Sequence, residues 1–398
     1  MKKVLLYVFI VVLLITNIFT FTQKVLLERK IENSNALNDV LDDKTVGLIK
    51  EITDNIDRDY FYEYDTKELK EGILKGLVNA LDDPYSEYMT VEEYKKFNDL
   101  ADSQYSGVGI IVSPGDDGYL TVVSPIKDGP AFKAGIKPGD KILKVNGEEF
   151  TSDTMQDAVS VMKGEAGEKV TLTILRKDEN NKIFDVDIVR EKIKLNTVEG
   201  EIIDETDHIG YIQITEFDRP TYTDFANVFK ELKTKNMKNL IIDLRGNPGG
   251  LLSVCANIAD FFLKDGDIVY TETNTGEKEY FEADSASEDL PLVILVDKGS
   301  ASASEILSGS LQDRNRAKVV GVQSFGKGIV QRIYDLSDKS ALKITISEYF
   351  LPSGKSIHKK GVTPDFVIEN DKNIKSIGPA NLSEDKQLQK AIEVLKGE

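Results

Sequence analysis

Three serines occupy alternate positions in one short stretch of the chain, and they are the first candidates for chemistry. Ser300, Ser302 and Ser304 lie between Gly299 and Glu305 in the sequence GSASASE. A strand-like run, PLVILVDKG, precedes them and a helical pattern, ASEILSGSLQD, follows, so they occupy a strand-to-helix junction. The free N–H groups and partial positive charge of a helix N-terminus stabilise a developing oxyanion. A nucleophilic serine is therefore one interpretation of this segment.

The same residues also fit a purely structural role. Ser302 and Glu305 have the spacing of a capping box, in which serine and glutamate satisfy unpaired N–H groups at the start of a helix. On local sequence alone, helix cap and nucleophile are equally good interpretations of Ser302. Ser300 follows the glycine turn directly, and Ser304 is expected in the first turn of the helix.

A serine nucleophile needs a base to take its proton, and histidine is scarce in this chain. The only two histidines, His208 and His358, have the sequence surroundings of exposed residues, so a Ser-His-Asp triad would need the fold to bring one of them to the serines. Lysine can act instead when burial keeps its amine neutral. Lys327 lies between two glycines in SFGKGIVQ, whereas most other lysines sit among charged residues. A solvated loop position also fits Lys327 on local sequence alone.

Composition and motifs argue against metals, nucleotides and nucleic acids. The sequence contains no HExxH or CxxC pattern, no GxSxG elbow and no phosphate-binding loop, so we expect neither a metal nor an organic cofactor. The formal net charge of −18 disfavours binding to nucleic acid. The single cysteine, Cys255, excludes a disulfide within the chain. A length of 398 residues, with 40% apolar and 30% charged residues, predicts two or three globular domains.

The N-terminal sequence, MKKVLLYVFIVVLLITNIFTFTQK, combines two lysines with an apolar run that ends near Phe21. The run is long enough to span a bilayer as a helix, and it lacks the small residues of a signal-peptide cleavage site. We therefore expect residues 1–22 to form a signal anchor and residues 23–43 a linker. Because Lys2 and Lys3 favour a cytoplasmic N-terminus, the rest of the chain is expected outside the cell membrane, or secreted if the anchor is cleaved.

Residues 44–100 show apolar residues at helical spacing. We expect two or three helices here, broken near residues 60–65 and again at an Asp-Pro turn, residues 83–84. The two apolar stripes are Val46, Ile49 and Ile52, and Leu69, Ile73 and Leu77. Such a small helical region buries little by itself, so we expect it to pack on a neighbouring domain or on a second copy of the chain.

Residues 105–190 alternate short strands with two brief helical segments. Strand character is found in GVGIIV, YLTVVSP, DKILKVNG, KVTLTILR and IFDVDIVR, and helical character in GPAFKAG and TMQDAVSVMKG. This segment resembles a PDZ domain, most specifically in SPIKDGPAFKAGIKPGDKILKVNG. The resemblance implies that an extended peptide adds as a strand to an exposed edge, with its terminal carboxylate on a glycine-containing loop. That loop would be Gly107, Val108, Gly109 and Ile110, although a plain turn into a strand also fits it.

Residues 191–370 alternate strands and helices, and near-continuous apolar runs such as LIIDL and PLVILV are typical of strands covered on both faces. We therefore expect an α/β domain with a mostly parallel sheet. Residues 371–398 are expected to form a C-terminal tail with an amphipathic helix beginning at Ser383. The predicted fold class is an α/β core with a PDZ domain of short strands and two helices, preceded by a helical region and a transmembrane anchor.

The serines and the lysine belong to one longer stretch, GSASASEILSGSLQDRNRAKVVGVQSFGKGIVQ, residues 299–331. This stretch resembles the catalytic segment of the C-terminal processing peptidases, tail-specific serine proteases with a Ser-Lys dyad assisted by a glutamine. The resemblance implies that Ser302 is the nucleophile, Lys327 the base and Gln331 the residue that orients the lysine. If Lys327 opens a helical turn, the spacing of four residues places the lysine and the glutamine on one face.

The segment DLRGNPGG, residues 243–250, also resembles the family, in which a glycine-rich turn after a strand supplies one oxyanion-hole N–H. The second N–H would come from the residue after the nucleophile, Ala303. Gly249 and Gly250 are both candidates for the first, with Gly249 preferred, while on motif alone this segment is only a strand-ending turn. The likeness covers about residues 45–368. One departure is Lys163, where the family often has an arginine, and a lysine would hold a bidentate contact between domains less well.

Taken together, the resemblance implies a membrane-anchored, extracytoplasmic serine endopeptidase that recognises substrate C-terminal tails through its PDZ domain. Its partners would be proteins or peptides with exposed C-termini and, through residues 45–98 and 383–398, a second copy in a homodimer. Two other functions stay open. One is a PDZ scaffold whose protease domain is silent, and the other is a hydrolase of esters or cell-wall peptides that uses the same dyad.

Overall fold

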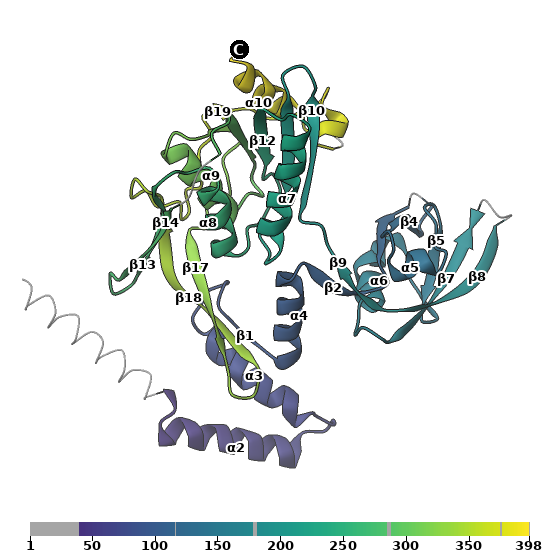
Figure 1. Ribbon diagram of the computed structural model, residues 1–398. Coiled ribbons are helices and arrows are strands. Elements are labelled where there is room, and N and C mark those ends of the chain that lie inside the picture. Colours follow the sequence, from purple (N-terminus) through teal and green to yellow (C-terminus); the bar gives the residue numbers. More distant parts are fainter. Residues whose placement is uncertain (1–39, 116, 178–180, 285–287, 375, 398) are drawn as a thin grey trace, which may run out of the picture. The chain divides into compact units, whose positions relative to one another are not determined.

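A computed structural model describes residues 40–115, 117–177, 181–284, 288–374 and 376–397 (Figure 1). The chain divides into two compact units, Met1–Ala80 and Leu81–Glu398. The predicted anchor, residues 1–22, lies outside the described residues. Within the described ranges, every helix is too short or too polar to cross a bilayer.

The described part of the first unit consists of two helices, α2 (Asp43–Asp59) and α3 (Thr66–Asn79). Each begins after an aspartate, Asp42 or Asp65, whose carboxylate accepts a hydrogen bond from a backbone N–H of the first turn. The break between the two helices confirms the one predicted near residues 60–65. The apolar side chains of both helices are largely exposed within the chain, among them Val46, Ile52, Leu69, Ile73 and Leu77.

The second unit contains a PDZ domain built on an antiparallel sheet in the order β3-β4-β5-β7-β8, with β6 beside β5. Its strands are β3 (Ile110–Pro114), β4 (Leu120–Pro125), β5 (Lys141–Val145), β6 (Glu148–Glu149), β7 (Lys169–Arg176) and β8 (Lys182–Val189). Its helices are α5 (Pro130–Lys133), α6 (Met155–Met162) and the 3₁₀ turn η1 (Ser152–Thr154). Alternate strand residues, such as Leu172 and Ile174, point into its core. The predicted pattern of strands and helices is confirmed, and β3 forms one edge of the sheet.

The chain enters and leaves the PDZ domain through one antiparallel ribbon of β2 (Gln104–Gly107) and β9 (Glu191–Lys194) (Figure 1). Helix α4 (Val91–Ala101) precedes it and begins with a complete capping box of Thr90 and Glu93. The last residues of this helix line a cavity together with residues of the α/β domain, so the segment before the PDZ domain also reaches that domain.

The α/β domain is organised around a six-stranded sheet in the order β10-β11-β12-β15-β16-β19, whose pairs are parallel except for β10 with β11. Its strands are β10 (Val198–Asp204), β11 (Ile209–Ile214), β12 (Asn239–Asp243), β15 (Leu292–Val296), β16 (Lys318–Gly321) and β19 (Phe366–Val367). Helices α7 (Thr221–Thr234), α8 (Leu252–Asp260) and α9 (Ala303–Asp313) pack on one face and α10 (Lys386–Lys396) on the other. The mostly parallel sheet predicted from the apolar runs is confirmed.

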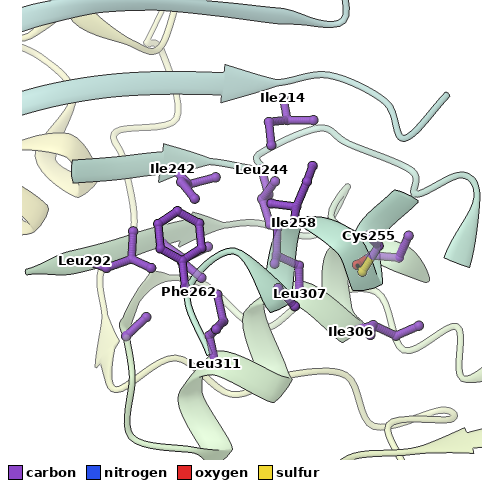
Figure 2. Packing of buried hydrophobic residues seen from close by; sticks show 14 of the residues in the cluster. Ile214, Ile242, Leu244, Cys255, Ile258, Phe262, Leu292, Ile306, Leu307 and Leu311 are labelled. Carbon is purple, nitrogen blue, oxygen red and sulfur yellow. Dashed lines mark hydrogen bonds between the residues drawn. The ribbon is translucent and has the colours of Figure 1, made fainter. Parts of the chain in front are cut away.

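Alternation along the central strands divides their side chains between the two faces. Ile242 and Leu292 pack on α8 and α9, where Figure 2 shows them beside Phe262 and Leu311. The intervening residues, such as Ile241, face α10. Because helices cover both faces, the apolar side chains of these strands are buried and stabilise the sheet. The candidate site extends from one edge of this stable sheet.

A second sheet carries the lysine segment. Its order is β1-β18-β13-β14, with β17 paired to β18. Its strands are β1 (Glu87–Met89), β13 (Gly266–Thr273), β14 (Lys278–Ala283), β17 (Ile329–Asp335) and β18 (Ala341–Phe350). Strand β1, which the helical pattern did not predict, brings the segment after Pro84 against β18 by pairing residues 87–89 with residues 341–343.

A buried charge network attaches the C-terminal helix to the end of β12. The guanidinium of Arg245 bonds to the carboxylates of Asp243 and Asp385 at 2.6 and 2.8 Å, and all three side chains are fully buried. Asp385 also caps α10, which therefore begins at Lys386 and not at the predicted Ser383. Burial by itself would raise the pKa of Asp385, but the hydrogen bonds and charge of Arg245 outweigh it and hold this pKa below its ordinary value.

Replacing Asp385 with asparagine should lower the free energy of unfolding at pH 7 by about 2–4 kcal/mol. Because the folded-state pKa of Asp385 is depressed, its contribution is present above the unfolded pKa of about 4 and is lost as the pH falls through the folded value. Urea unfolding of residues 31–398 at several pH values measures both effects. Asp371→Asn, which removes an exposed ion pair with Lys386, is the control and should cost less than about 1 kcal/mol.

Candidate active site

Ser302 lies at the strand-to-helix junction after β15, immediately before α9. Its backbone adopts φ 53° and ψ −114°, a conformation that is strained for a residue with a Cβ. The turn presents the Ser302 side chain to a cavity of 360 Å³. Such strain at an accessible hydroxyl is a common feature of functional sites.

The two neighbouring serines have structural roles. The hydroxyl of Ser300 donates to the carbonyl of Leu244 at 2.8 Å, and the hydroxyl of Ser304 donates to the carbonyl of Asn247 at 3.0 Å. Both serine residues are fully buried. Of the three serines, therefore, only Ser302 lines the cavity.

The capping box predicted for Ser302 and Glu305 is formed only on the glutamate side. The carboxylate of Glu305 accepts from the Ser302 N–H at 2.9 Å. The N–H of Glu305 donates to the carbonyl oxygen of Ser302, also at 2.9 Å. The Ser302 hydroxyl bonds instead to the hydroxyl of Tyr349, with 2.6 Å between the two oxygens. The hydroxyl is therefore not used to cap the helix.

Glu305 joins the serine turn to the loop that carries Lys327. Besides the Ser302 N–H, its buried carboxylate accepts from the Ser324 hydroxyl at 2.5 Å, the Gly326 N–H at 2.7 Å and the Lys327 N–H at 2.8 Å. Four donors fix both carboxylate oxygens, which compensates for burying the charge. This one side chain sets the relative position of the two chain segments that supply Ser302 and Lys327.

Lys327 is half-buried and lines the same cavity as Ser302. Among the described residues its amine has no hydrogen bond or ion pair, and it lies 4.5 Å from the ring centroid of Tyr85. Burial lowers the pKa of Lys327 below its ordinary value, the like charge of Lys343 lowers it further, and the carboxylate of Asp83 acts in the opposite direction. The first two effects favour the neutral amine that a general base requires.

Gln331 does not follow Lys327 on a helix, contrary to the expectation of a helical turn. Lys327 precedes strand β17, which spans residues 329–335 and whose pairing with β18 shifts register between Val330 and Gln331. The side-chain amide of Gln331 donates to the hydroxyl of Thr345 at 3.4 Å, and Gln331 lines the cavity together with Lys327. The predicted helical turn is therefore absent, and what the two residues share is the cavity that both of them line.

The glycine-rich turn after β12 packs directly against the serine turn. A Cβ at Gly249, where φ is +107°, would lie 2.8 Å from the Cβ of Ser302, so only glycine allows this approach. The Gly249 N–H donates to the side chain of Asn247 at 2.8 Å, whereas Gly250 and Ala303 line the cavity. Because its N–H is already bonded, Gly249 is a poorer candidate for the oxyanion donor than predicted. Gly250, which lines the cavity, is the better candidate.

The cavity has a largely apolar lining with a few charged groups. Its apolar residues are Phe97, Leu100, Ala101, Phe217, Pro248, Leu251, Leu252, Ala303, Ile306, Ile329, Val330 and Ile333. Glu216 and Asp218 lie at the same cavity, and burial raises the pKa of both carboxyls above their ordinary values. Neither His208 nor His358 lines the cavity. Both histidines were predicted to be exposed, but they are partly buried. The site therefore offers a hydroxyl, an amine and backbone donors beside an apolar surface.

The loop predicted to bind a peptide carboxylate precedes the edge strand β3. Gly107, Val108 and Gly109 are buried, and the carbonyl oxygen of Gly109 accepts from the N–H of Ile126 at 2.9 Å. The side chain of Lys163 contacts the Tyr105 ring, with 5.6 Å from its nitrogen to the ring centroid. This contact joins the end of α6 to the ribbon that leads to the α/β domain.

Comparison with known proteins assigns this arrangement to a family. Residues 208–368 match peptidase family S41, residues 121–176 match the PDZ domain, and residues 13–93 match the N-terminal domain of the activating protease CtpB. The chain is 38% identical over 345 residues to the carboxy-terminal processing protease CtpB of Bacillus subtilis. The aligned region covers 86% of this chain and 71% of that protein. This chain belongs to the carboxy-terminal processing proteases.

Further similarities agree with this assignment. The carboxy-terminal-processing protease of Bartonella bacilliformis is 36% identical over 367 residues, covering 90% of this chain and 82% of that protein. An S41 protease structure from Bacteroides fragilis has a TM-score of 0.57 at 16% identity, covers 85% of this chain and 91% of that chain, and supports the fold alone. The predicted family and enzyme class are confirmed: this processing protease is a serine endopeptidase with a PDZ domain.

Several residues at the site of this processing protease were not predicted from the sequence. Tyr349, Asp83, Tyr85 and Lys343 approach Ser302 or Lys327 only through the pairing of β1, β17 and β18. No local motif identifies them, because their partners are distant in the chain. Glu305 did leave a signal, its capping-box spacing, although that spacing gave no indication of its bonds to the lysine loop.

Replacing Glu305 with glutamine should lower the free energy of unfolding by about 3 kcal/mol, because its amide group would face backbone N–H donors. Proteolysis should fall as well, since the serine and lysine segments lose their common acceptor. Urea unfolding and casein cleavage by residues 31–398 measure the two effects. The control Glu282→Gln, at an exposed position on β14, should change stability by less than about 0.5 kcal/mol. Equal behaviour of the two variants would contradict the role given to Glu305.

Proposed function

We propose that this processing protease cleaves peptide bonds with Ser302 as nucleophile and Lys327 as general base, Gln331 orienting the lysine. The observation that carries the proposal is that Ser302 and Lys327 line one cavity, with their backbones attached to the same Glu305 carboxylate. The hydroxyls of Ser300 and Ser304 are occupied by bonds to backbone carbonyl oxygens, so Ser302 is the serine of this segment whose hydroxyl faces the cavity.

In this mechanism the neutral amine of Lys327 takes the proton of the Ser302 hydroxyl as its oxygen attacks the substrate carbonyl. The N–H groups of Ala303 and Gly250 stabilise the oxyanion, and the N-terminus of α9 contributes its partial positive charge. The protonated lysine then supplies the proton that the leaving amine needs. Water hydrolyses the acyl-enzyme, again with Lys327 as base, and no metal or organic cofactor takes part.

Substrate recognition is assigned to the PDZ domain. The free side of β3 can accept a peptide as an added strand, and the backbone of Gly107, Val108, Gly109 and Ile110 would bind the terminal carboxylate. The apolar lining of the cavity favours an apolar substrate side chain beside the scissile bond. The protease domain would therefore cut upstream of a captured C-terminal tail.

We also propose an extracytoplasmic location, a membrane anchor at residues 1–22 and a homodimer. The apolar N-terminal sequence supports the anchor, and the exposed apolar residues of α2 and α3 support association with a second copy. Fractionation of cells expressing the full chain tests the anchor. Sedimentation equilibrium of residues 31–398 tests the dimer, which a monomer at micromolar concentration would contradict.

Ser302→Ala should abolish cleavage of casein by residues 31–398, because it removes the attacking oxygen. Ser300→Ala and Ser304→Ala, which lose buried hydrogen bonds, should remain active and lose about 1–3 kcal/mol of stability each. Product formation on gels and thermal melting distinguish the two kinds of effect. Cleavage by Ser302→Ala at the wild-type rate would refute the proposed nucleophile.

The value of kcat/KM should rise as the pH increases through the lowered pKa of Lys327, because the neutral amine is the active form. Lys343→Gln removes a like charge, so the pKa of Lys327 should increase and the rising limb should move to higher pH by about 0.5–1 unit. Asp83→Asn should move the limb the other way. Lys355→Met, at an exposed lysine, is the control and should leave the midpoint unchanged.

A further inference from the structure

One buried hydroxyl touches the candidate nucleophile and takes no part in the mechanism above. The Tyr349 oxygen lies 2.6 Å from the Ser302 Oγ, and Tyr349 is 3% exposed. It lines the cavity together with Ser302, Lys327 and the oxyanion candidates. The Ser302 oxygen is therefore in contact with a phenol before substrate binds.

The position of this phenol is fixed by the same loop that carries the lysine. The backbone N–H of Tyr349 donates to the carbonyl oxygen of Gly328, the residue after Lys327, at 3.0 Å. Its ring belongs to the core under α8 and α9, together with Ile306 and Leu307. Tyr349 is thus held at its backbone by the lysine segment and at its ring by the helix that follows the nucleophile.

The phenol is the better donor of the two hydroxyls. Tyrosine is much more acidic than serine, so the favoured arrangement has the Tyr349 O–H donating and the Ser302 Oγ accepting. Burial raises the pKa of Tyr349, the bond to Ser302 lowers it, the charge of Glu305 raises it, and the net effect is a pKa above its ordinary value. The raised pKa of Tyr349 and the lowered pKa of Lys327 therefore favour the protonated phenol beside the neutral amine.

We propose that Tyr349 is a further catalytic residue, whose hydroxyl donates a hydrogen bond to the Ser302 Oγ and stabilises the negative charge that forms on this oxygen. The proposal rests on Ser302 being the nucleophile. It assigns Tyr349 a task distinct from that of the oxyanion hole, because Ala303 and Gly250 serve the carbonyl oxygen of the substrate while Tyr349 serves the serine oxygen.

The proton balance is compatible with this role. With Tyr349 donating to the Ser302 oxygen, the serine proton is free to point at Lys327. As the bond to the carbonyl carbon forms, this proton moves to the lysine amine, the carbonyl electron pair moves to the oxyanion, and Tyr349 retains its own proton. When the acyl-enzyme breaks down, the Ser302 oxygen leaves with an electron pair, is again stabilised by Tyr349, and recovers a proton from Lys327.

Tyr349→Phe in residues 31–398 should lower kcat for a peptide substrate about 10- to 100-fold and leave KM within about twofold, because the lost bond strengthens only as charge develops. A fluorophosphonate probe, which forms a phosphonate ester on the serine oxygen with loss of fluoride, should label Ser302 more slowly by a similar factor. Tyr88→Phe is the matched control: it removes a hydroxyl from a buried tyrosine of β1, the strand beside β18, and should leave both rates unchanged.

A second variant separates the hydroxyl from the fold. 3-Fluorotyrosine at position 349 keeps a donor of nearly the same size, so it should retain kcat within about threefold of wild type even if phenylalanine lowers the melting temperature. Wild-type kcat and labelling in a folded Tyr349→Phe variant would overturn the proposal. So would an increase in kcat, which would mean that the phenol holds the serine in a resting orientation. Cleavage and labelling that persist in Ser302→Ala would instead refute the proposed nucleophile itself.

Discussion

The position of the site depends on one buried carboxylate. Glu305 stands in the first turn of α9 and accepts from the Ser302 N–H on one side and from the Gly326 and Lys327 N–H groups on the other. A fully buried charge is tolerated only where hydrogen-bond donors surround it. If the two loops that provide these donors separated, the carboxylate would be left unpaired in an apolar interior. The requirement to satisfy Glu305 thus becomes a requirement that serine and lysine face one cavity.

The sheet supplies the other half of this geometry. Strands β12 and β15 are parallel neighbours, so the turns that follow them, with Gly249 and Ser302, emerge side by side at one edge. Asn247 ties the turns together, since its carbonyl oxygen accepts from the Ala301 N–H and from the Ser304 hydroxyl. Glycine at 249 and strained backbone at 302 follow from how closely these turns approach.

Local patterns in the sequence were sufficient to predict most of the elements, and they also indicated the candidate reacting groups. Apolar runs predicted the buried strands, and the stretch around Ser302 and Lys327 predicted the dyad by resemblance. Gly250 is proposed over Gly249 as the oxyanion donor because the Gly249 N–H bonds to Asn247, a contact that no sequence pattern indicates. Tyr349 could not be found either, since only the pairing of distant strands brings its hydroxyl to the serine.

The surroundings of Lys327 connect substrate binding to its protonation. The Tyr85 ring and the charge of Asp83 favour the ammonium form, whereas burial and the charge of Lys343 favour the neutral amine. Burial is the largest of these effects, and the cavity beside the lysine is mostly lined by apolar side chains. An apolar peptide that displaces water from this cavity desolvates the amine further, so the binding of a fitting substrate itself shifts Lys327 toward the neutral form that the proposed mechanism requires.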